Sequence, residues 1–485
     1  MKSEYSSTQI EFEGVGGRKL VASFDAEHIS SDGGAVLLHQ VDHRFKLLKK
    51  FAACFTDYRD PELIEHEVEH LVRQRVLGIA CGYEDLNDHA TLRDDPLFAT
   101  VVGKVDPLGL ERREKKDRGH PLASPSTLNR LELTPSDATV ASRYRKVVYD
   151  AESVADFFVD AYLDAHSKRP KEIVLDLDAT DDLIHGAQEG RFFHGYYGNY
   201  CYLPLYIFAG NFLLCAKLRK SDIDASKGSV EELQRIITRI RGRWPSAKFV
   251  LRADSGFARD EIMSWAEAND VDYIFGLAQN SRLRQLIQSE LETVKLEAEN
   301  TGKPARMFRE LRYRTLDSWS RERRVVAKAE QLGDKSNPRF VVTSFSKTQW
   351  ETRPLYEELY CARGDMENRI KEQQLDMFAD RTSAHTMREP MPQLVCAHTM
   401  RANQLRLWFS SVAYVLMNLL RHFGLKGTEF ERAQVGTIRL KLLKLGAIVR
   451  VSVRRICLSI SAAAPARDAF HRIAALLEAN VPSFG

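Results

Sequence analysis

Cysteine is sparse in this chain, and no two cysteines are spaced as a metal-binding or redox pair. The seven cysteines are scattered over 485 residues, at positions 54, 81, 201, 215, 361, 396 and 457. An odd, dispersed set without a C-x-x-C pair argues against a disulfide framework and against a zinc knuckle. We therefore expect reduced thiols in a cytoplasmic protein.

Long apolar runs are also missing. The first residues, MKSEYSSTQIEFEG, hold no apolar core after their charges, so we expect no signal peptide. The most apolar stretch, residues 405–420, is interrupted by Arg406, Ser410, Ser411 and Asn418. A buried helix explains this pattern better than a membrane span. We expect a soluble intracellular protein with no membrane partner.

The net charge is small, at +3, and the 44% hydrophobic and 28% charged residues are typical of a globular protein. At this length we expect two or three domains. Two segments are locally basic. Residues 302–328 hold nine Lys or Arg against three acids, and residues 421–455 hold nine against two. Such segments can bind polyphosphates through counterion release, or they can be solvated charged surfaces. Composition leaves both interpretations open.

The central part of the chain alternates between strand-like and helix-like patterns, which predicts an α/β fold around one sheet. A strand pair over residues 8–25 and helices over 60–100 and 137–167 are expected before it. The predicted central elements are a strand at 171–180, a strand pair at 196–220 turning at Gly210-Asn211, a helix at 230–241, a strand at 248–257, a helix at 260–269 and strands at 271–278 and 340–345. A basic β-rich insertion is predicted at 281–337, and a long helix is predicted from Pro354.

Acidic residues end two of these predicted strands. Asp178 ends one and Asp254 ends another, while Glu367 lies on the long predicted helix. Carboxylates from separate elements are the ligands that Mg²⁺ prefers in proteins. Two such ions about 3.5–4 Å apart can flank a phosphodiester during its cleavage. The three acids are therefore candidate metal ligands and catalytic residues.

Tyr360, Arg363 and Glu367 are spaced by three and four residues, so on a regular helix they share one face. An arginine beside a metal-binding acid can bind phosphate. The alternative is a surface Arg–Glu pair, worth about 0.3–0.5 kcal/mol. Spacing alone does not decide between them.

Several of these motifs occur in the order found in a known family. LDLDAT, RADSGF and YCARGDMENRIKEQQLD, together with residues 72–96 and 401–421, resemble insertion-sequence DDE transposases with a ribonuclease-H-like core. The match is closest to the "thirteen-eighty" family of the "IS-four" superfamily. The resemblance implies metal ligation and catalysis by Asp178, Asp254 and Glu367. Asp176 competes with Asp178, because residues two apart in a strand point to one face. Asp178 is preferred because it begins D-x-T, as the family's first Asp does.

The superfamily signature Y-x2-R-x3-E-x6-K adds DNA-contacting roles for Tyr360 and Arg363. Counted from Glu367, the signature lysine falls at Gln374, beside Gln373, and the nearby Lys371 is the candidate substitute for DNA binding. A second departure is the repeat AHTMR, at 384–388 and again at 397–401.

The resemblance also implies a domain order, cofactors and partners. The expected regions are a mainly helical DNA-binding region at 1–168, the two parts of the core at 169–280 and 338–422 around the insertion at 281–337, and a basic helical C-terminal region at 423–485. Two Mg²⁺ or Mn²⁺ ions are expected. The expected partners are double-stranded DNA, as terminal inverted repeats and target DNA, and a second copy in a homodimeric synaptic complex. A cut-and-paste reaction in the bacterial cytoplasm, beside the nucleoid, would follow.

Two alternatives remain. His66, Glu67 and His70 form a literal H-E-x-x-H, which on a helix could bind zinc in a peptidase. A transposase-derived protein that binds DNA without cutting it is the other.

An aromatic cluster follows the first candidate acid. It could stack on bases, although core packing is the expected role. Its members are Phe192, Phe193, Tyr196, Tyr197, Tyr200 and Tyr202.

Overall fold

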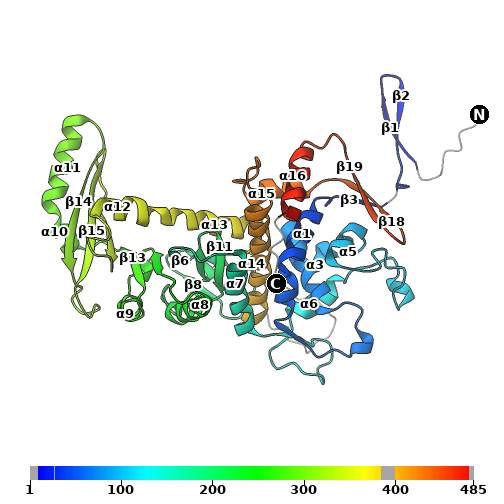
Figure 1. Cartoon of the computed structure of the whole chain (residues 1–485), viewed down its shortest axis with the longest axis horizontal. Helices are drawn as coiled ribbons and strands as arrows, with labels where there is room; N and C mark the ends of the chain where they lie inside the picture. Colours follow the sequence, from blue (N-terminus) through cyan, green and yellow to red (C-terminus); the bar gives the residue numbers. More distant parts are fainter. Residues whose placement is uncertain (1–8, 27, 384–398, 480–485) are drawn as a thin grey trace, which may run out of the picture. The chain divides into compact units, whose positions relative to one another are not determined.

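The computed structural model describes residues 9–26, 28–383 and 399–479. These residues form two compact units, each built from segments that are distant in the sequence (Figure 1). The first unit contains Met1–Arg44, Pro61–Leu128 and Leu420–Gly485, and the second contains Phe45–Asp60 and Asn129–Leu419.

The second unit is organised around a nine-stranded mixed sheet. Its strands in spatial order are β11 (Phe212–Lys217), β10 (Leu205–Ala209), β6 (Ile173–Ala179), β12 (Phe249–Ala253), β13 (Asp272–Leu277), β17 (Arg339–Thr343), β15 (Arg323–Leu332) and β14 (Ala305–Tyr313), with β16 (Lys335–Ser336) paired to β15. β12 runs parallel to both β6 and β13, and the other pairs are antiparallel. The prediction of a mixed α/β fold with one central sheet is confirmed.

Helices and two small sheets complete this unit. The helices are α2 (Leu47–Ala52), α7 (Ala151–Ala165), α8 (Ser229–Arg243), α9 (Asp260–Ala268), α10 (Ser281–Leu286), α11 (Gln288–Thr301), α12 (Thr352–Pro354), α13 (Gly364–Asp376) and most of α14 (Met400–Phe423). The small sheets pair β4 (Phe55–Asp57) with β5 (Val147–Tyr149), and β7 (Asp182–Leu183) with β9 (Asn199–Tyr202) and β8 (Phe192–His194).

Helix α14 confirms the prediction of a buried helix over residues 405–420. Leu405, Leu407, Phe409 and Leu416 are at most 1% exposed, and its polar Ser411 and Asn418 are also buried. No helix among the described residues is long and apolar enough to cross a membrane.

The segment 281–337 contains the predicted strands, and these extend the central sheet. β15 pairs with β17, which pairs with β13, so the added strands continue the same hydrogen-bonded layer. Helices α10 and α11 lie beside β14 and β15 (Figure 1). The segment therefore interrupts the core in the sequence, but in space its strands belong to the central sheet.

The cations of this segment are largely neutralised by acids. Six of the nine basic residues of 302–328 form ion pairs, and three of the six, Arg306, Arg309 and Arg321, keep side-chain exposures of 42–59%. The pairs join Arg306 to Glu330 and Glu357, Arg309 to Glu290, Arg321 to Glu267, Arg323 to Asp260 and Glu267, Arg324 to Glu310, and Lys328 to Glu330.

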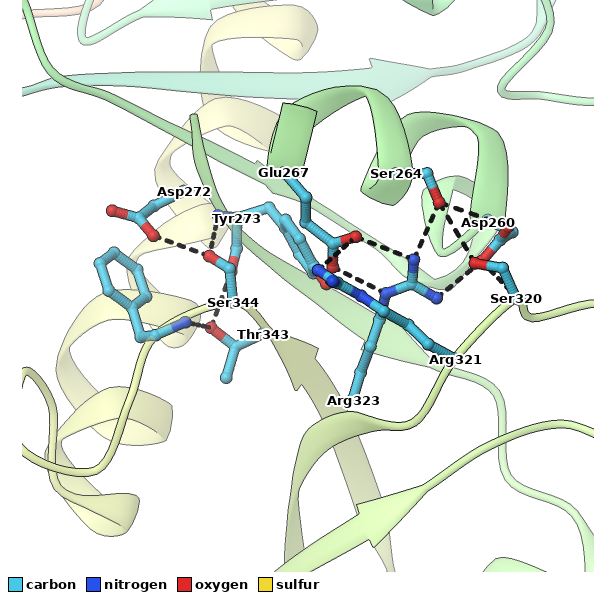
Figure 2. Close-up of polar contacts among 11 residues, drawn as sticks. Asp260, Ser264, Glu267, Asp272, Tyr273, Ser320, Arg321, Arg323, Thr343 and Ser344 are labelled. Atoms are coloured by element: carbon cyan, nitrogen blue, oxygen red, sulfur yellow. Dashed lines mark hydrogen bonds and ion pairs between the residues drawn. The ribbon is translucent and has the colours of Figure 1, made fainter. Parts of the chain in front are cut away.

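Arg323 is the centre of the densest of these networks (Figure 2). Its side chain is only 2% exposed, and it donates to Asp260 at 2.6 Å and to Glu267 at 2.9 Å. Glu267 also accepts a hydrogen bond from the Tyr273 hydroxyl at 2.8 Å and pairs with Arg321 at 2.7 Å. The network ties α9 to strands β13 and β15.

The first unit combines helices with two hairpins. Its helices are α1 (Ala35–Phe45), α3 (Val68–Cys81), α4 (His89–Leu92), α5 (Pro96–Val102), the start of α6 (Pro125–Glu132), α15 (Val435–Ile438) and α16 (Arg467–Ala479). Its strands are β1 (Ile10–Val15) paired with β2 (Arg18–Ala22), and β3 (Ile29–Ser30) paired with β18 (Ala447–Val451), which pairs with β19 (Ile456–Ile460). The N-terminal strand pair is as predicted, whereas the hairpin β18–β19 lies in a segment predicted to be helical.

Close backbone contact holds the two ends of this unit's sequence together. Gly34 packs so tightly that a Cβ atom there would lie 1.8 Å from the Leu442 carbonyl oxygen. Lys444 pairs with the buried Asp32 at 2.7 Å, and Arg439 donates to the Ala80 carbonyl at the end of α3. Part of the basic character of 421–455 is therefore structural, while Arg450, Arg454 and Arg455 are exposed on the β18–β19 hairpin.

Candidate functional site

The strand register places Asp178 and Asp254 at the same edge of the central sheet. Asp178 lies near the end of β6, and Asp254 directly follows β12. These strands are parallel neighbours with Ala253 opposite Leu177, so the next residue of each strand is one of the two acids. The carboxyl ends of parallel strands are where such sheets place ligand-binding side chains.

The two carboxylates and Glu367 act on one another electrostatically. Burial raises the pKa of Asp178 to about 6, and the negative charge of Asp254 adds to this, with a smaller contribution from Glu367. The positive charge of Arg363 opposes the rise. A carboxyl beside other carboxylates has a raised pKa because like charges disfavour ionisation. Asp178 therefore lies within electrostatic reach of Asp254, Glu367 and Arg363, and the roles of these residues stay a prediction.

The segment that carries Glu367 is not one regular α-helix, which corrects the prediction. α12 gives way to a π-helical turn at Leu355–Tyr360, then to a 3₁₀ turn at Cys361–Arg363, and then to α13. Changes of this kind within a helix frequently occur at functional sites. Arg363 still reaches Glu367, donating to its Oε1 at 2.8 Å.

Tyr360 comes from the last position of the π-helical turn, and a glycine makes room for it. A Cβ on Gly276 of β13 would lie 2.6 Å from the Tyr360 hydroxyl and 3.0 Å from the Ser255 nitrogen, next to Asp254. Tyr360 therefore lies beside the backbone that carries Asp254. A glycine inside a strand is the sequence signal for such a close approach.

Asp176, the competitor of Asp178, is engaged elsewhere. It is 1% exposed, and Arg252 donates to both of its carboxylate oxygens, at 2.5 and 2.9 Å. This bidentate pair occupies the carboxylate and favours Asp178 as the acid available to a ligand. Arg252 lies within RADSGF, where its spacing alone does not predict a role.

The three candidate acids keep oxygens that no described protein group binds. Asp178 accepts one hydrogen bond from the Ala179 nitrogen at 2.9 Å, Asp254 accepts one from the Gly256 nitrogen at 2.8 Å, and Glu367 accepts one from Arg363. Each has a second oxygen left, which is the donor type that Mg²⁺ and Mn²⁺ prefer. Among the described residues, no three His, Cys, Asp or Glu side chains form a ready-made metal cluster. The donor chemistry fits a divalent ion.

A comparison with protein families decides the class. Residues 12–482 match the model of the family described as transposase DDE domain group 1, which covers nearly the whole chain. The chain belongs to this family. It is a DDE transposase. A search of curated proteins found no match. The family implies that the protein binds DNA, and its domains generally use divalent metal ions.

Counting from Glu367, the lysine of the signature would fall at Gln374, which is partly buried and whose Nε2 donates to the Asp181 carbonyl oxygen at 3.1 Å. The neighbouring Gln373 is 0% exposed, and its Nε2 donates to the Ser411 hydroxyl of α14 at 2.8 Å. Lys371 is exposed on the same helix. Residues 384–398, which include the first AHTMR copy, lie outside the described part of the chain.

The H-E-x-x-H motif of the transposase does not form a zinc-binding helix face. α3 begins at Val68, and Glu67 is its N-cap with an extended backbone, at ψ 159°. His66 therefore precedes the helix, so it does not share a helical face with His70 as a zinc peptidase requires. The described residues contain no metal-binding group of three such side chains.

The aromatic cluster corrects a further expectation. Four of its members are exposed by 44–87%, so core packing is wrong for Phe192, Phe193, Tyr196 and Tyr200, whereas Tyr202 is fully buried. The Arg191 guanidinium lies 3.9 Å from the centre of the Tyr200 ring. Burial raises the pKa of Tyr197 to about 12, and the charges of Asp181 and Asp178 contribute, which places this hairpin beside the candidate site.

Proposed function

We propose that Asp178, Asp254 and Glu367 hold two Mg²⁺ or Mn²⁺ ions and that this transposase cleaves the ends of its insertion sequence and joins them to target DNA. The observation that carries the proposal is the alignment of Asp178 and Asp254 on parallel neighbouring strands, with their charges acting on one another. A bound cation would offset the repulsion between carboxylates that act on one another in this way.

The sheet supports a ribonuclease-H-like core. Strands β11, β10 and β6 form an antiparallel meander, and β12 and β13 then run parallel to β6. The helix with Glu367 follows the inserted strands. The "thirteen-eighty" family of the "IS-four" superfamily and the regions assigned from the sequence stay part of this proposal.

The chemistry needs no covalent protein intermediate. Water attacks the phosphorus at the element's end, the bond to the 3′ oxygen breaks, and a free 3′ hydroxyl and a 5′ phosphate result. That hydroxyl then attacks a target phosphodiester and displaces a 3′ oxygen of the target. Divalent ions held by these carboxylates would activate the nucleophile and stabilise the leaving oxygen. In the chain itself, the three carboxylates set the ligand geometry, and Arg363, bonded to Glu367, offers its guanidinium to a phosphate.

DNA would contact the residues around this centre. Arg363 and Tyr360 lie beside the carboxylates, and Lys371 is exposed on the same helix. The exposed aromatic rings of Tyr196 and Tyr200 offer surfaces on which bases can stack. We propose terminal inverted repeats and target DNA as the substrates and a homodimer as the synaptic form.

A nicking assay tests the proposal. Purified transposase is incubated with plasmid DNA that carries the sequences flanking its own gene, with and without Mg²⁺. We expect wild-type protein to nick these ends only with the metal, and Asp254→Asn to bind the same DNA without nicking it.

The control is Asp365→Asn, which removes an exposed acid two residues from Glu367. It should nick as the wild type does. Equal nicking by Asp254→Asn would contradict the proposed site. Specific end binding by a wild-type protein that never nicks would indicate the DNA-binding alternative.

A further inference from the structure

Directly below the candidate metal ligands, a buried ion pair joins the two strands. Arg252 of β12 lies opposite Asp176 of β6 in the register. Its Nε donates to Asp176 Oδ1 at 2.5 Å, and its Nη2 donates to Oδ2 at 2.9 Å. Arg252 is 8% exposed and Asp176 is 1% exposed, so water does not compete for these bonds.

The same guanidinium reaches the third element of the site. Arg252 Nη1 donates to the Leu359 carbonyl oxygen at 2.7 Å. Leu359 lies in the π-helical turn immediately before Tyr360, in the segment that leads to Arg363 and Glu367. One side chain of β12 is therefore hydrogen-bonded to β6, which carries Asp178, and to the π-helical turn that leads to Glu367.

The position of this pair relative to the acids follows from strand geometry. Side chains two residues apart in a strand point to one face. Asp178 follows Asp176 by two residues and Asp254 follows Arg252 by two, so the pair and the acids are successive levels on one face. A planar guanidinium bonded to both carboxylate oxygens fixes distance and orientation together, which an ammonium group cannot do.

Energetics indicate that stability alone does not explain the pair. Desolvation offsets much of the attraction in a buried ion pair, and well-packed apolar residues of similar volume are often as stabilising. Apolar residues in place of Arg252 and Asp176 could preserve stability, but they could not fix the distance and orientation between the two strands.

We propose that Arg252 is a positioning residue of the transposase: acting through Asp176 and the Leu359 carbonyl, it sets the spacing of Asp178, Asp254 and Glu367. This inference rests on the proposed function of those acids. Groups that orient metal ligands typically change metal affinity 10–100-fold when they are mutated. A misplacement of about 1 Å can slow a reaction about 100-fold.

The decisive variant replaces both partners, as Asp176→Leu with Arg252→Met. It leaves no unpaired buried charge, so it should fold with a thermal transition near that of the wild type. We expect DNA binding to be retained, nicking to fall about 100-fold, and the Mn²⁺ dissociation constant to rise about tenfold or more. A purely stabilising pair predicts wild-type nicking and wild-type Mn²⁺ affinity in this folded variant, and that result would overturn the proposal.

Arg252→Lys provides a second test if the double variant does not fold. It keeps the charge and loses the bidentate geometry, so nicking and Mn²⁺ affinity should fall while DNA binding is retained. Wild-type values in this variant would also overturn the proposal. Arg323→Met, which disturbs a buried pair away from the site, is the control and should leave Mn²⁺ affinity unchanged.

The two proposals fail differently. If wild-type protein neither nicks nor binds Mn²⁺, the proposed function is wrong, and the inference about Arg252 falls with it. If wild-type protein does both and Asp254→Asn does neither, unchanged behaviour of the Arg252 variants rejects the positioning role alone.

Discussion

The network around Arg323 and the candidate site are both built from acids and arginines, but in different proportions. Arginines match the acids in the network, whereas acids outnumber arginines at the candidate site. In the network, Asp260 and Glu267 face Arg321 and Arg323 (Figure 2). Burial would raise the pKa of both acids, but the bonds from Arg323 and its neighbours outweigh it and lower each pKa. At the site, burial and the charge of Asp254 raise the pKa of Asp178, and Arg363 offsets only part of the effect.

We interpret the difference as one between a structural and a functional role. Acids that are matched by arginines hold α9 against the sheet, whereas acids in excess, as we propose for the candidate site, would need a cation. Strongly perturbed acids in clusters are candidates for functional sites for this reason. The comparison predicts that variants in the first region change stability and variants in the second change activity.

The largest effect should come from Asp178→Asn. Loss of one metal ligand should slow nicking by at least about 1,000-fold, roughly 4 kcal/mol in activation free energy. The thermal transition should stay the same or rise, because one source of repulsion is removed. A nicking time course and calorimetry measure the two quantities. A large fall in the transition temperature with nicking per folded molecule retained would break the comparison.

Arg323→Met should have the opposite pattern. It leaves Asp260 and Glu267 without their main partner and should destabilise the fold by about 3–5 kcal/mol. Chemical denaturation gives this difference. Nicking per folded molecule should remain within about twofold of wild type, and a loss of catalysis as large as that of Asp178→Asn would contradict the separation.

The sequence predicted the strands and the acids that end them, because buried strands have a recognisable composition and acids are rare within them. It could not predict which acids stay in excess. The partners of Arg323 come from α9, and those of Arg306 from β15 and from the turn before Tyr360. Pairings of this kind depend on strand register. A regular helical period of 3.6 residues does not predict the π-helical turn. Strand propensity does not report burial, so it does not predict the exposure of the aromatic hairpin.

The pH dependence of stability sharpens the comparison. The folded-state pKa values of Asp260 and Glu267 are lowered, so their contribution is present above the unfolded-state pKa of about 4 and is lost as the pH falls through the folded-state values. Wild type and Arg323→Met should therefore differ in stability at pH 7 and converge below about pH 4. A difference that stays constant with pH would show that Arg323 acts through packing.

The smallest effect should come from the exposed cation of α13. Lys371→Ala should weaken DNA binding a few-fold and reduce the slope of log K against log salt by about 1, as expected for one lost phosphate contact. Gln373→Lys should lower stability instead, because position 373 is fully buried. Titrations at several salt concentrations test the first variant. An unchanged slope would remove Lys371 from the DNA-binding surface.

The central claim is that Asp178, Asp254 and Glu367 are acids in excess that bind divalent cations. Calorimetric titration with Mn²⁺ tests it most directly, on wild type, Asp254→Asn and the balanced-acid control Asp260→Asn. The account predicts that wild type and Asp260→Asn bind Mn²⁺ alike and that Asp254→Asn loses at least tenfold in affinity. Mn²⁺ binding by Asp254→Asn with wild-type affinity would contradict it.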